Sequence, residues 1–393
     1  MNGDRVCALV LGGHVNGYSI IRELKDELID DIILFDDKIS LSRFSNKIKI
    51  FKKTEFIPST LLKDLYKLNE DYSKIIIYPT DDIYIECLIE IYDQIKKFCF
   101  VPFNKSNISQ ALDKYYQYQI CDQNKIPYPK CIKIIENSQI AEIESLIFPV
   151  IVKPLSRTRA SKLLFKNIYI EDLQDFDSKV IHIKNALKLQ VPLMASEFIP
   201  GDDSQIYAYS CYRSHEGNIL NEWTGKKITQ YPDNFGVFST AVNAHNSRLV
   251  QLGQKFVEKI DGFGFIEPEF KFDQRDGEFK LMECNFRPMM WHRVGFLSGV
   301  RLIKTQYEYA LGHNITKYNQ NNNKKINLIL MLHEIPNLIF RKNYLKKFYK
   351  ITFKSKHISF GIFNFKDPLP GIFAFMIMIK LVLNLCLKHI NRN

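Results

Sequence analysis

The chain has 393 residues, of which 46% are hydrophobic and 25% are charged, and its formal net charge is +11. This composition is typical of a globular protein and excludes a disordered or collagen-like chain. The length predicts two or three folded units. The modest basic excess suits a nucleic acid, an anionic membrane surface or a phosphorylated substrate as partner.

The cysteines and the N-terminal residues indicate the cellular compartment that we expect for the protein. The 8 cysteines are scattered along the chain, with no CxxC pair and no histidine cluster beside them. We therefore expect reduced thiols in a cytoplasmic protein and neither a disulfide framework nor a zinc site. The first apolar run ends at Gly12-Gly13 and leads into an amphipathic segment, which argues against a secretory signal.

Short apolar runs alternate with amphipathic segments in the N-terminal part of the chain. Three of the runs, which we expect to form parallel strands, cover residues 6–11, 32–37 and 74–82. The alternation predicts an open α/β sheet, that is, a Rossmann-like domain over residues 1–104. Such sheets bind ligands at the carboxyl ends of their strands.

Residues at two of these strand ends are candidate substrate contacts. Gly12 and Gly13 belong to "GGHVNG", which is not a complete GxGxxG motif. They are predicted either to form a tight strand-to-helix turn or to hold an anionic substrate with their amides. Asp82 ends the segment "KIIIYPTDD" and is predicted either to cap a helix or to contact the substrate.

A strand that ends in a lysine, followed by a basic loop, is predicted within residues 105–190. The strand is "VIVKP", which contains Lys153, and the loop "LSRTRASK" adds Arg157, Arg159 and Lys162. Three cations in a short loop suit phosphate groups. The alternative is a solvated basic hairpin.

The segment "EPEFKFDQRDGEFKLMECNFRP" predicts a β-hairpin with its turn near Asp276. Because side chains alternate along a strand, a turn centred there pairs Glu269 with Glu283 and places Asn285 on the same face. The opposite face is predicted to be core and carries Phe270, Phe272, Met282, Cys284 and Phe286.

The polar face of this hairpin is a candidate metal site. Directly paired residues of a hairpin have Cβ atoms ~5 Å apart. Two carboxylates that close repel each other unless a cation joins them. Oxygen ligands with open positions for phosphate suit Mg²⁺ better than zinc. Arg287 continues the same face and is suited to stabilise a transferring phosphoryl group. The alternative is a solvent-exposed face with an isolated ion pair.

The C-terminal residues 319–393 form a basic extension behind an Asn-rich segment, "YNQNNNKKIN". From Ile335 to Lys366 there is no acidic residue, and cations alternate with aromatic residues in "RKNYLKKFYKITFKSK". The following apolar stretch carries Lys380, Asn384 and Lys388, which are spaced by four residues and so share one face of a helix.

This pattern predicts an amphipathic helix that lies on an anionic membrane surface and does not span it. The alternatives are packing on the body of the protein, packing on a second subunit in a homodimer, or a true span. RNA binding has no motif behind it, so we expect no nucleic acid partner.

The order of these motifs resembles the ATP-grasp superfamily of carboxylate–amine ligases. The resemblance covers residues 5–300 and points to the branch that includes D-aspartate ligase and carbamoyl phosphate synthetase-like proteins. Its strongest part is the hairpin, which is similar to the family's acid facing an E-x-N-x-R sequence. The implied fold is a Rossmann-like pre-grasp domain, an ATP-grasp small lobe over 105–190 and a central lobe over 191–318.

The resemblance implies ATP as cofactor, with Mg²⁺ or Mn²⁺ held by Glu269, Glu283 and Asn285. It implies that Arg287 lies on the phosphates and that Lys227 lies near the phosphate or acyl phosphate. The other implied ATP contacts are Lys114, Lys153, Lys162, the backbone of Glu197, Phe198 and Ile199, and Asp203 near the ribose. One departure is that the loop after Lys153 lacks glycine, so side-chain cations stand where many relatives use backbone amides.

The implied reaction has two steps. A carboxylate attacks the γ-phosphorus of MgATP, and an amine then attacks the acyl phosphate to give an amide, ADP and phosphate. The substrates are a small-molecule carboxylate and an amine, and the basic extension favours a cell-wall or surface-glycan precursor at the inner face of the membrane. Three alternatives stay open: a non-catalytic ATP-binding module, a small-molecule kinase and a nicotinamide oxidoreductase.

Overall fold

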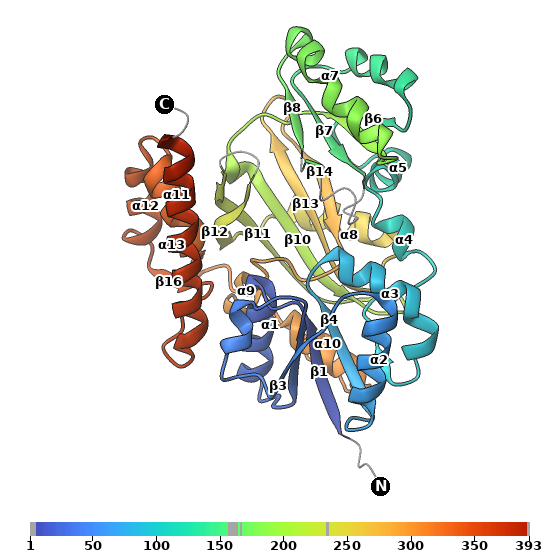
Figure 1. The fold of residues 1–393 in the computed structure, drawn as a ribbon, viewed down its shortest axis with the longest axis vertical. Coiled ribbons are helices and arrows are strands. Elements are labelled where there is room, and N and C mark those ends of the chain that lie inside the picture. Colours follow the sequence, from blue (N-terminus) through green and yellow to red (C-terminus); the bar gives the residue numbers. More distant parts are fainter. Residues whose placement is uncertain (1–4, 156–163, 166, 233–235, 391–393) are drawn as a thin grey trace.

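The computed structural model describes residues 5–155, 164–165, 167–232 and 236–390, with side chains up to residue 383. Within these residues there are three sheets (Figure 1). The parallel sheet and the four-stranded sheet lie at opposite ends of a long seven-stranded sheet. Lys162 and the rest of the basic loop at 156–163 lie outside the described residues.

The N-terminal sheet is parallel, with strand order β3-β2-β1-β4-β5. Its strands are β1 (Val6–Leu11), β2 (Ile32–Asp36), β3 (Ile50–Lys53), β4 (Lys74–Pro79) and β5 (Cys99–Phe100). The elements between them are α1 (Val15–Asp26), η1 (Leu41–Phe44), α2 (Pro58–Asn69) and α3 (Asp82–Ile95). Apolar runs buried on both faces form the central strands, as the sequence predicted for a Rossmann-like domain.

The four-stranded sheet is antiparallel, with order β6-β9-β7-β8. Its strands are β6 (Cys131–Ile134), β7 (Val150–Pro154), β8 (Ile168–Ile170) and β9 (Leu193–Glu197). The helical elements of this part of the chain are α4 (Ile108–Ala111), α5 (Lys114–Gln123), η2 (Asn137–Ser145) and α7 (Leu173–Lys188).

The seven-stranded sheet has the order β14-β13-β10-β11-β12-β15-β16. Its strands are β10 (Ile206–Arg213), β11 (Ile219–Tyr231), β12 (Val237–Asn243), β13 (Gly264–Asp273), β14 (Glu278–Asn285), β15 (Ile326–Ile329) and β16 (His357–Phe360). The accompanying helical elements are η3 (Asp203–Gln205), α8 (Ser247–Ile260), α9 (Arg293–Leu297) and α10 (Leu302–Leu311).

The C-terminal extension is folded and lies against the rest of the chain (Figure 1). Its helices are α11 (Met331–Phe340), α12 (Tyr344–Thr352) and α13 (Pro368–Ile390). The buried Asp367 fixes the start of α13, because its carboxylate accepts hydrogen bonds from Tyr18 Oη at 3.0 Å and Ser45 Oγ at 2.5 Å. In the part of the chain that the structure describes, no helix is long and apolar enough to cross a bilayer.

The four-stranded and the seven-stranded sheets both extend past residues that the sequence suggested as domain boundaries. The four-stranded sheet takes in β9, which lies after the expected boundary at residue 190. The seven-stranded sheet takes in β15 and β16, which lie after the expected boundary at residue 318. The extension is therefore part of the central sheet and not only a tail.

The predicted hairpin is present as β13 and β14, and the predicted pairing of Glu269 with Glu283 is confirmed. The register of the two strands shifts by one residue next to this pair, and the sequence did not reveal this shift. Phe270 pairs with Leu281, so Met282 is the extra residue of a β-bulge. The expectation that Met282 packs in the core was wrong: Leu281 is fully buried there, and Met282 lines a cavity.

Candidate active site

A cavity of about 600 Å³ brings together most of the residues that the sequence singled out. Its size suits a small-molecule ligand. It is lined by side chains or backbone of Asp82, Lys114, Lys153, Glu197, Phe198, Ile199, Lys227, Glu269, Glu283, Asn285 and Arg287. These residues come from the N-terminal domain, from the four-stranded sheet and from the seven-stranded sheet, so the cavity depends on all three units.

The two carboxylates of the hairpin each face a lysine. Lys227 Nζ lies 2.7 Å from Glu269 Oε2, and both side chains are less than a tenth exposed. Lys114 Nζ lies 3.7 Å from Glu283 Oε2. The lysines offset the repulsion between the paired carboxylates, and a cation that enters the site would share this task.

Glu269, Glu283 and Asn285 fit a magnesium ion by their chemistry. They offer hard oxygen donors at facing or neighbouring positions of the hairpin, and all of them line the cavity. The side-chain amide nitrogen of Asn285 is buried and has no hydrogen-bond partner among the described residues, so it does not fix the orientation of the amide, whose oxygen is the atom able to bind a metal. No group of three or more His, Cys, Asp or Glu side chains forms a closed cation site in the described ranges. Mg²⁺ does not need such a closed site, because it commonly binds one or two carboxylates together with substrate phosphates.

Lys153 projects from β7 toward the same carboxylates. Its ammonium lies 3.4 Å from the backbone carbonyl of Met282 and 5.8 Å from the centre of the Tyr118 ring. Burial lowers the pKa of Lys153 to about 8, and the nearby charge of Glu283 opposes that shift. A cation held in this environment is a strong partner for a phosphate group that enters the cavity.

The backbone between the four-stranded and the seven-stranded sheet is held in a fixed conformation at Glu197–Ile199. The N–H of Glu197 donates to the carbonyl of Lys130 at 2.9 Å, and the N–H of Phe198 donates to the carbonyl of Pro149 at 2.8 Å. This segment borders the cavity at the end of β9. It is the segment that the sequence predicted for adenine.

Asp82 and Arg287 form an ion pair across the boundary between the N-terminal domain and the central sheet. Arg287 Nε lies 2.7 Å from Asp82 Oδ1, and both side chains line the cavity. The predicted alternative that Asp82 caps a helix is corrected, because the side chain of Asp81 is the N-cap of α3 and accepts from the N–H of Ile83. Asp82 is therefore free to orient the guanidinium of Arg287.

Gly12 and Gly13 do not reach the cavity. The N–H of Gly12 donates to the carbonyl of Phe35 at 2.8 Å, and the N–H of Gly13 donates to the carboxylate of Asp36 at 2.7 Å. Gly12 has a φ of +91°, which favours glycine. The structure supports the tight turn, and the predicted contact of these amides with an anionic substrate is not supported.

Comparisons with known proteins give relatives in sequence and in structure. A comparison with protein-family profiles finds no matching family. D-aspartate ligase from Enterococcus faecium (strain Aus0004) is 24% identical to this chain over 392 residues, which cover 93% of this chain and 92% of the ligase.

Solved structures are similar to this chain in overall fold. The ADP complex of PurK, N5-carboxyaminoimidazole ribonucleotide synthetase, matches with a TM-score of 0.64 and 14% identity, over 86% of this chain and 85% of that chain. The L-amino acid ligase from Bacillus licheniformis matches with a TM-score of 0.59 and 12% identity, over 78% and 74%. The chain has the ATP-grasp fold. The resemblance inferred from the sequence motifs is confirmed at the level of the fold.

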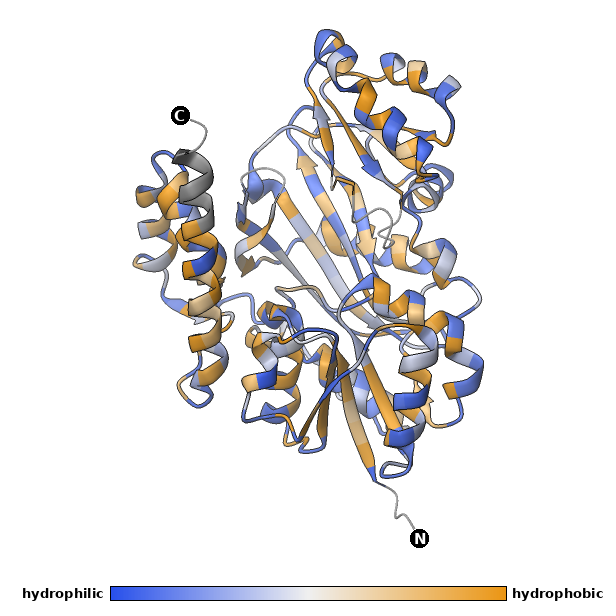
Figure 2. Cartoon of the chain, in the orientation of Figure 1, coloured by the Kyte–Doolittle hydropathy of each residue, from blue (hydrophilic) through white to orange (hydrophobic). Residues whose placement is uncertain are grey.

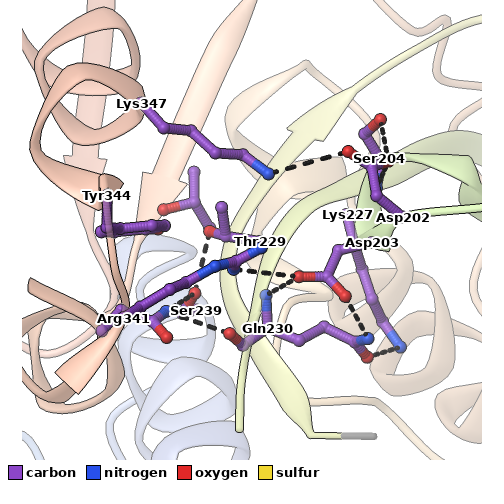
Figure 3. Close-up of polar contacts among 12 residues, drawn as sticks. Asp202, Asp203, Ser204, Lys227, Thr229, Gln230, Ser239, Arg341, Tyr344 and Lys347 are labelled. Atoms are coloured by element: carbon purple, nitrogen blue, oxygen red, sulfur yellow. Dashed lines mark hydrogen bonds and ion pairs between the residues drawn. The ribbon is translucent and has the colours of Figure 1, made fainter. Parts of the chain in front are cut away.

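Asp203 has a different place in this ATP-grasp fold from the predicted one near the ribose. It is 1% exposed and does not line the cavity. Its carboxylate accepts from the backbone N–H and the side-chain amide of Gln230, both at 2.9 Å, and lies 3.5 Å from Arg341 (Figure 3). With its oxygens engaged in this way, Asp203 anchors β11 and the C-terminal extension, and a ribose contact is not supported.

Sequence reasoning missed two features of the site. Lys271 lines the cavity with its ammonium 4.7 Å from the centre of the Phe198 ring, and burial lowers the pKa of Lys271 to about 8. It lies two positions after Glu269, so strand alternation could have revealed it. Gln230 joins Asp203 to Lys227 (Figure 3), and strand alternation alone could not have revealed this contact.

Proposed function

We propose that the chain is an ATP-dependent ligase that joins a carboxylate to an amine and releases ADP and phosphate. The observation that carries the proposal is the hairpin pair Glu269 and Glu283, each facing a lysine and lining one cavity with Arg287. A fold that served only as a scaffold would have no use for this set. The fold of the solved neighbours and the D-aspartate ligase relative support the same reaction class.

ATP binding is assigned to one half of the cavity. The backbone at Glu197–Ile199 would hold the adenine, and Lys153 and Lys114 would attract the phosphates. Glu269, Glu283 and Asn285 would hold Mg²⁺, which when bound supplies the charge that neutralises the transferring phosphoryl group. The Mn²⁺ ion could take the same ligands.

The transfer itself needs positioning and charge more than covalent chemistry from the protein. Arg287, oriented by Asp82, would hold the substrate carboxylate or the acyl phosphate next to the γ-phosphate. Lys227 would stabilise the negative charge that develops when the carboxylate oxygen bonds to phosphorus and the ADP oxygen leaves. The amine then forms the C–N bond, and phosphate departs from the carbonyl carbon.

The proposed substrates are an amino acid and a cell-wall or surface-glycan precursor. The name of the full-length relative, D-aspartate ligase, motivates the first, and the basic C-terminal extension motivates the second. We propose a cytoplasmic location with peripheral contact at the inner face of the membrane, and the substrate site would then lie within reach of a lipid-linked precursor.

Phosphate release with omitted substrates tests the reaction class. The purified protein would receive MgATP with pooled acids, pooled amines, or both. A ligase releases phosphate in a sustained way only with both pools. A small-molecule kinase would consume ATP without the amine and release no phosphate, and that result would overturn the proposal. A binding module would show ATP binding with no turnover in any combination.

A further inference from the structure

Large apolar side chains are exposed on the C-terminal extension far more than elsewhere. Across the described residues, more than half of the exposed large apolar side chains lie between positions 339 and 383. Figure 2 shows apolar colouring along the helices of this unit. Exposed apolar surface on this scale marks an interaction site.

Helix α12 exposes three large apolar side chains to solvent. Leu345, Tyr349 and Phe353, at the end of the helix, are 72%, 52% and 74% exposed. They are spaced by four residues, so they form one stripe, and the rings of Tyr349 and Phe353 stack with centroids 5.4 Å apart. The helix is held on the protein by other residues, Tyr344 and Ile351, which are buried.

A row of lysines runs beside this apolar stripe. Lys346 and Lys350 are exposed and lie four residues apart on α12, each one position after a residue of the stripe, and the exposed Lys354 follows just beyond the end of the helix. Between Ile335 and the end of the described residues, the sequence has one acidic residue, Asp367, and its side chain is buried. The exposed charge of this surface is therefore entirely basic in the described residues.

Helix α13 continues the apolar surface. Its buried positions in the described part are Pro370, Gly371, Ala374 and Met378, which follow one side of the helix and form a narrow contact face. The remaining face exposes large side chains, which include Ile372, Met376, Ile379 and Leu383. The protein itself leaves this face uncovered.

We propose that the surface formed by the stripe of α12, its row of lysines and the exposed face of α13 docks on an anionic lipid bilayer. Apolar rings and aliphatic chains would enter the boundary between headgroups and acyl chains, and the lysines would contact the lipid phosphates. A second copy of the chain is a poor occupant, because two such surfaces would bring rows of lysines together without any carboxylate between them.

Docking would fix the orientation of the ATP-grasp lobes relative to the membrane. Lys347 of α12 lies 3.9 Å from Asp202, and Arg341 lies 3.5 Å from Asp203, so the extension is tied to the segment that follows the adenine hinge (Figure 3). The docking surface is separate from the residues that line the cavity. Membrane docking and the proposed ligase reaction can therefore be tested independently of each other.

Vesicle flotation tests the proposal without ATP or substrates. The full chain would be mixed with vesicles of phosphatidylcholine alone, or of equal parts phosphatidylcholine and phosphatidylglycerol. We expect binding only to the anionic vesicles, with loss of binding as the ionic strength rises toward ~1 M, where charges are screened beyond ~3 Å. The triple variant Lys346→Gln, Lys350→Gln, Lys354→Gln should partition roughly 100-fold more weakly, about fivefold for each lysine.

The matched control removes three exposed lysines elsewhere, with Lys63→Gln, Lys67→Gln and Lys184→Gln. This control should bind like the unmodified protein, and all variants should unfold at the same temperature. Equal binding of the two triple variants would overturn the proposal, as would failure of the unmodified chain to float with anionic vesicles. A dimer that dissociates when Leu345 and Phe353 are changed to serine, without vesicle binding, would assign the surface to a second copy instead.

Discussion

Replacing Lys227 with methionine is expected to destabilise the ATP-free protein strongly. Lys227 Nζ lies 2.7 Å from Glu269 Oε2, and the two side chains are only 8% and 7% exposed. The substitution leaves the carboxylate of Glu269 buried opposite that of Glu283, with its nearest cation gone. Removal of one partner from a buried ion pair costs about 3–5 kcal/mol of unfolding free energy.

A second substitution isolates the cause of this loss. In the Lys227→Met background, Glu269→Gln removes the uncompensated charge and should restore most of the unfolding free energy. The exposed pair of Lys96 and Asp93 is the control, and Lys96→Met should leave the unfolding free energy nearly unchanged. Addition of MgATP should reduce the deficit of Lys227→Met, because the metal replaces the lost positive charge next to Glu269.

Urea denaturation followed by tryptophan fluorescence measures these effects. The chain has two tryptophans, Trp223 and Trp291, and both are buried at the seven-stranded sheet that carries the ion pair. If the destabilisations of Lys227→Met and Glu269→Gln simply add in the double variant, the two side chains are not coupled, and the account of how lysines balance the paired carboxylates is wrong.

Three further substitutions test other parts of the site. MgATP affinity, measured by calorimetric titration, should fall as the pH rises above about 8. Burial lowers the pKa of Lys153 to about 8, and only the charged ammonium attracts phosphate. The Lys153→Met variant should bind MgATP weakly at every pH. Asp82→Asn should lower kcat/KM by roughly tenfold or more in phosphate-release assays, since Arg287 loses the carboxylate that orients it. Arg341→Gln should cost roughly 1 kcal/mol of unfolding free energy and speed protease cleavage of the C-terminal extension, because Asp203 loses its cation.

The hairpin shows which structural features the periodicity of the sequence can predict and which it cannot. Alternation of side chains was sufficient to predict that Glu269 and Glu283 face each other, and the structure agrees. It could not predict the bulge at Met282, which depends on packing against distant parts of the chain. The carbonyl of Met282 accepts from Tyr118 Oη at 3.0 Å, and the N–H of Leu281 donates to the carbonyl of Pro127 at 2.8 Å.

The contacts of Asp203 could not be predicted from the sequence. Its neighbours in the sequence suggested a place near the nucleotide, but its partners are Gln230 and Arg341, from a different strand and from the C-terminal extension. Such buried polar contacts arise from tertiary packing and produce no periodic pattern in the sequence. The same holds for α12, because the sequence predicted a basic, apolar segment but not which of its faces is exposed.

The product of a complete reaction tests the central claim most directly. Unmodified protein and Glu283→Ala would be incubated with MgATP, pooled amino acids and cell-wall precursors, and new masses would be recorded together with released phosphate. The ligase account predicts a product lighter by one water than the sum of an acid and an amine, formed with one phosphate per product and absent with Glu283→Ala. A phosphorylated product that forms without any amine, or an equal yield from Glu283→Ala, would contradict it.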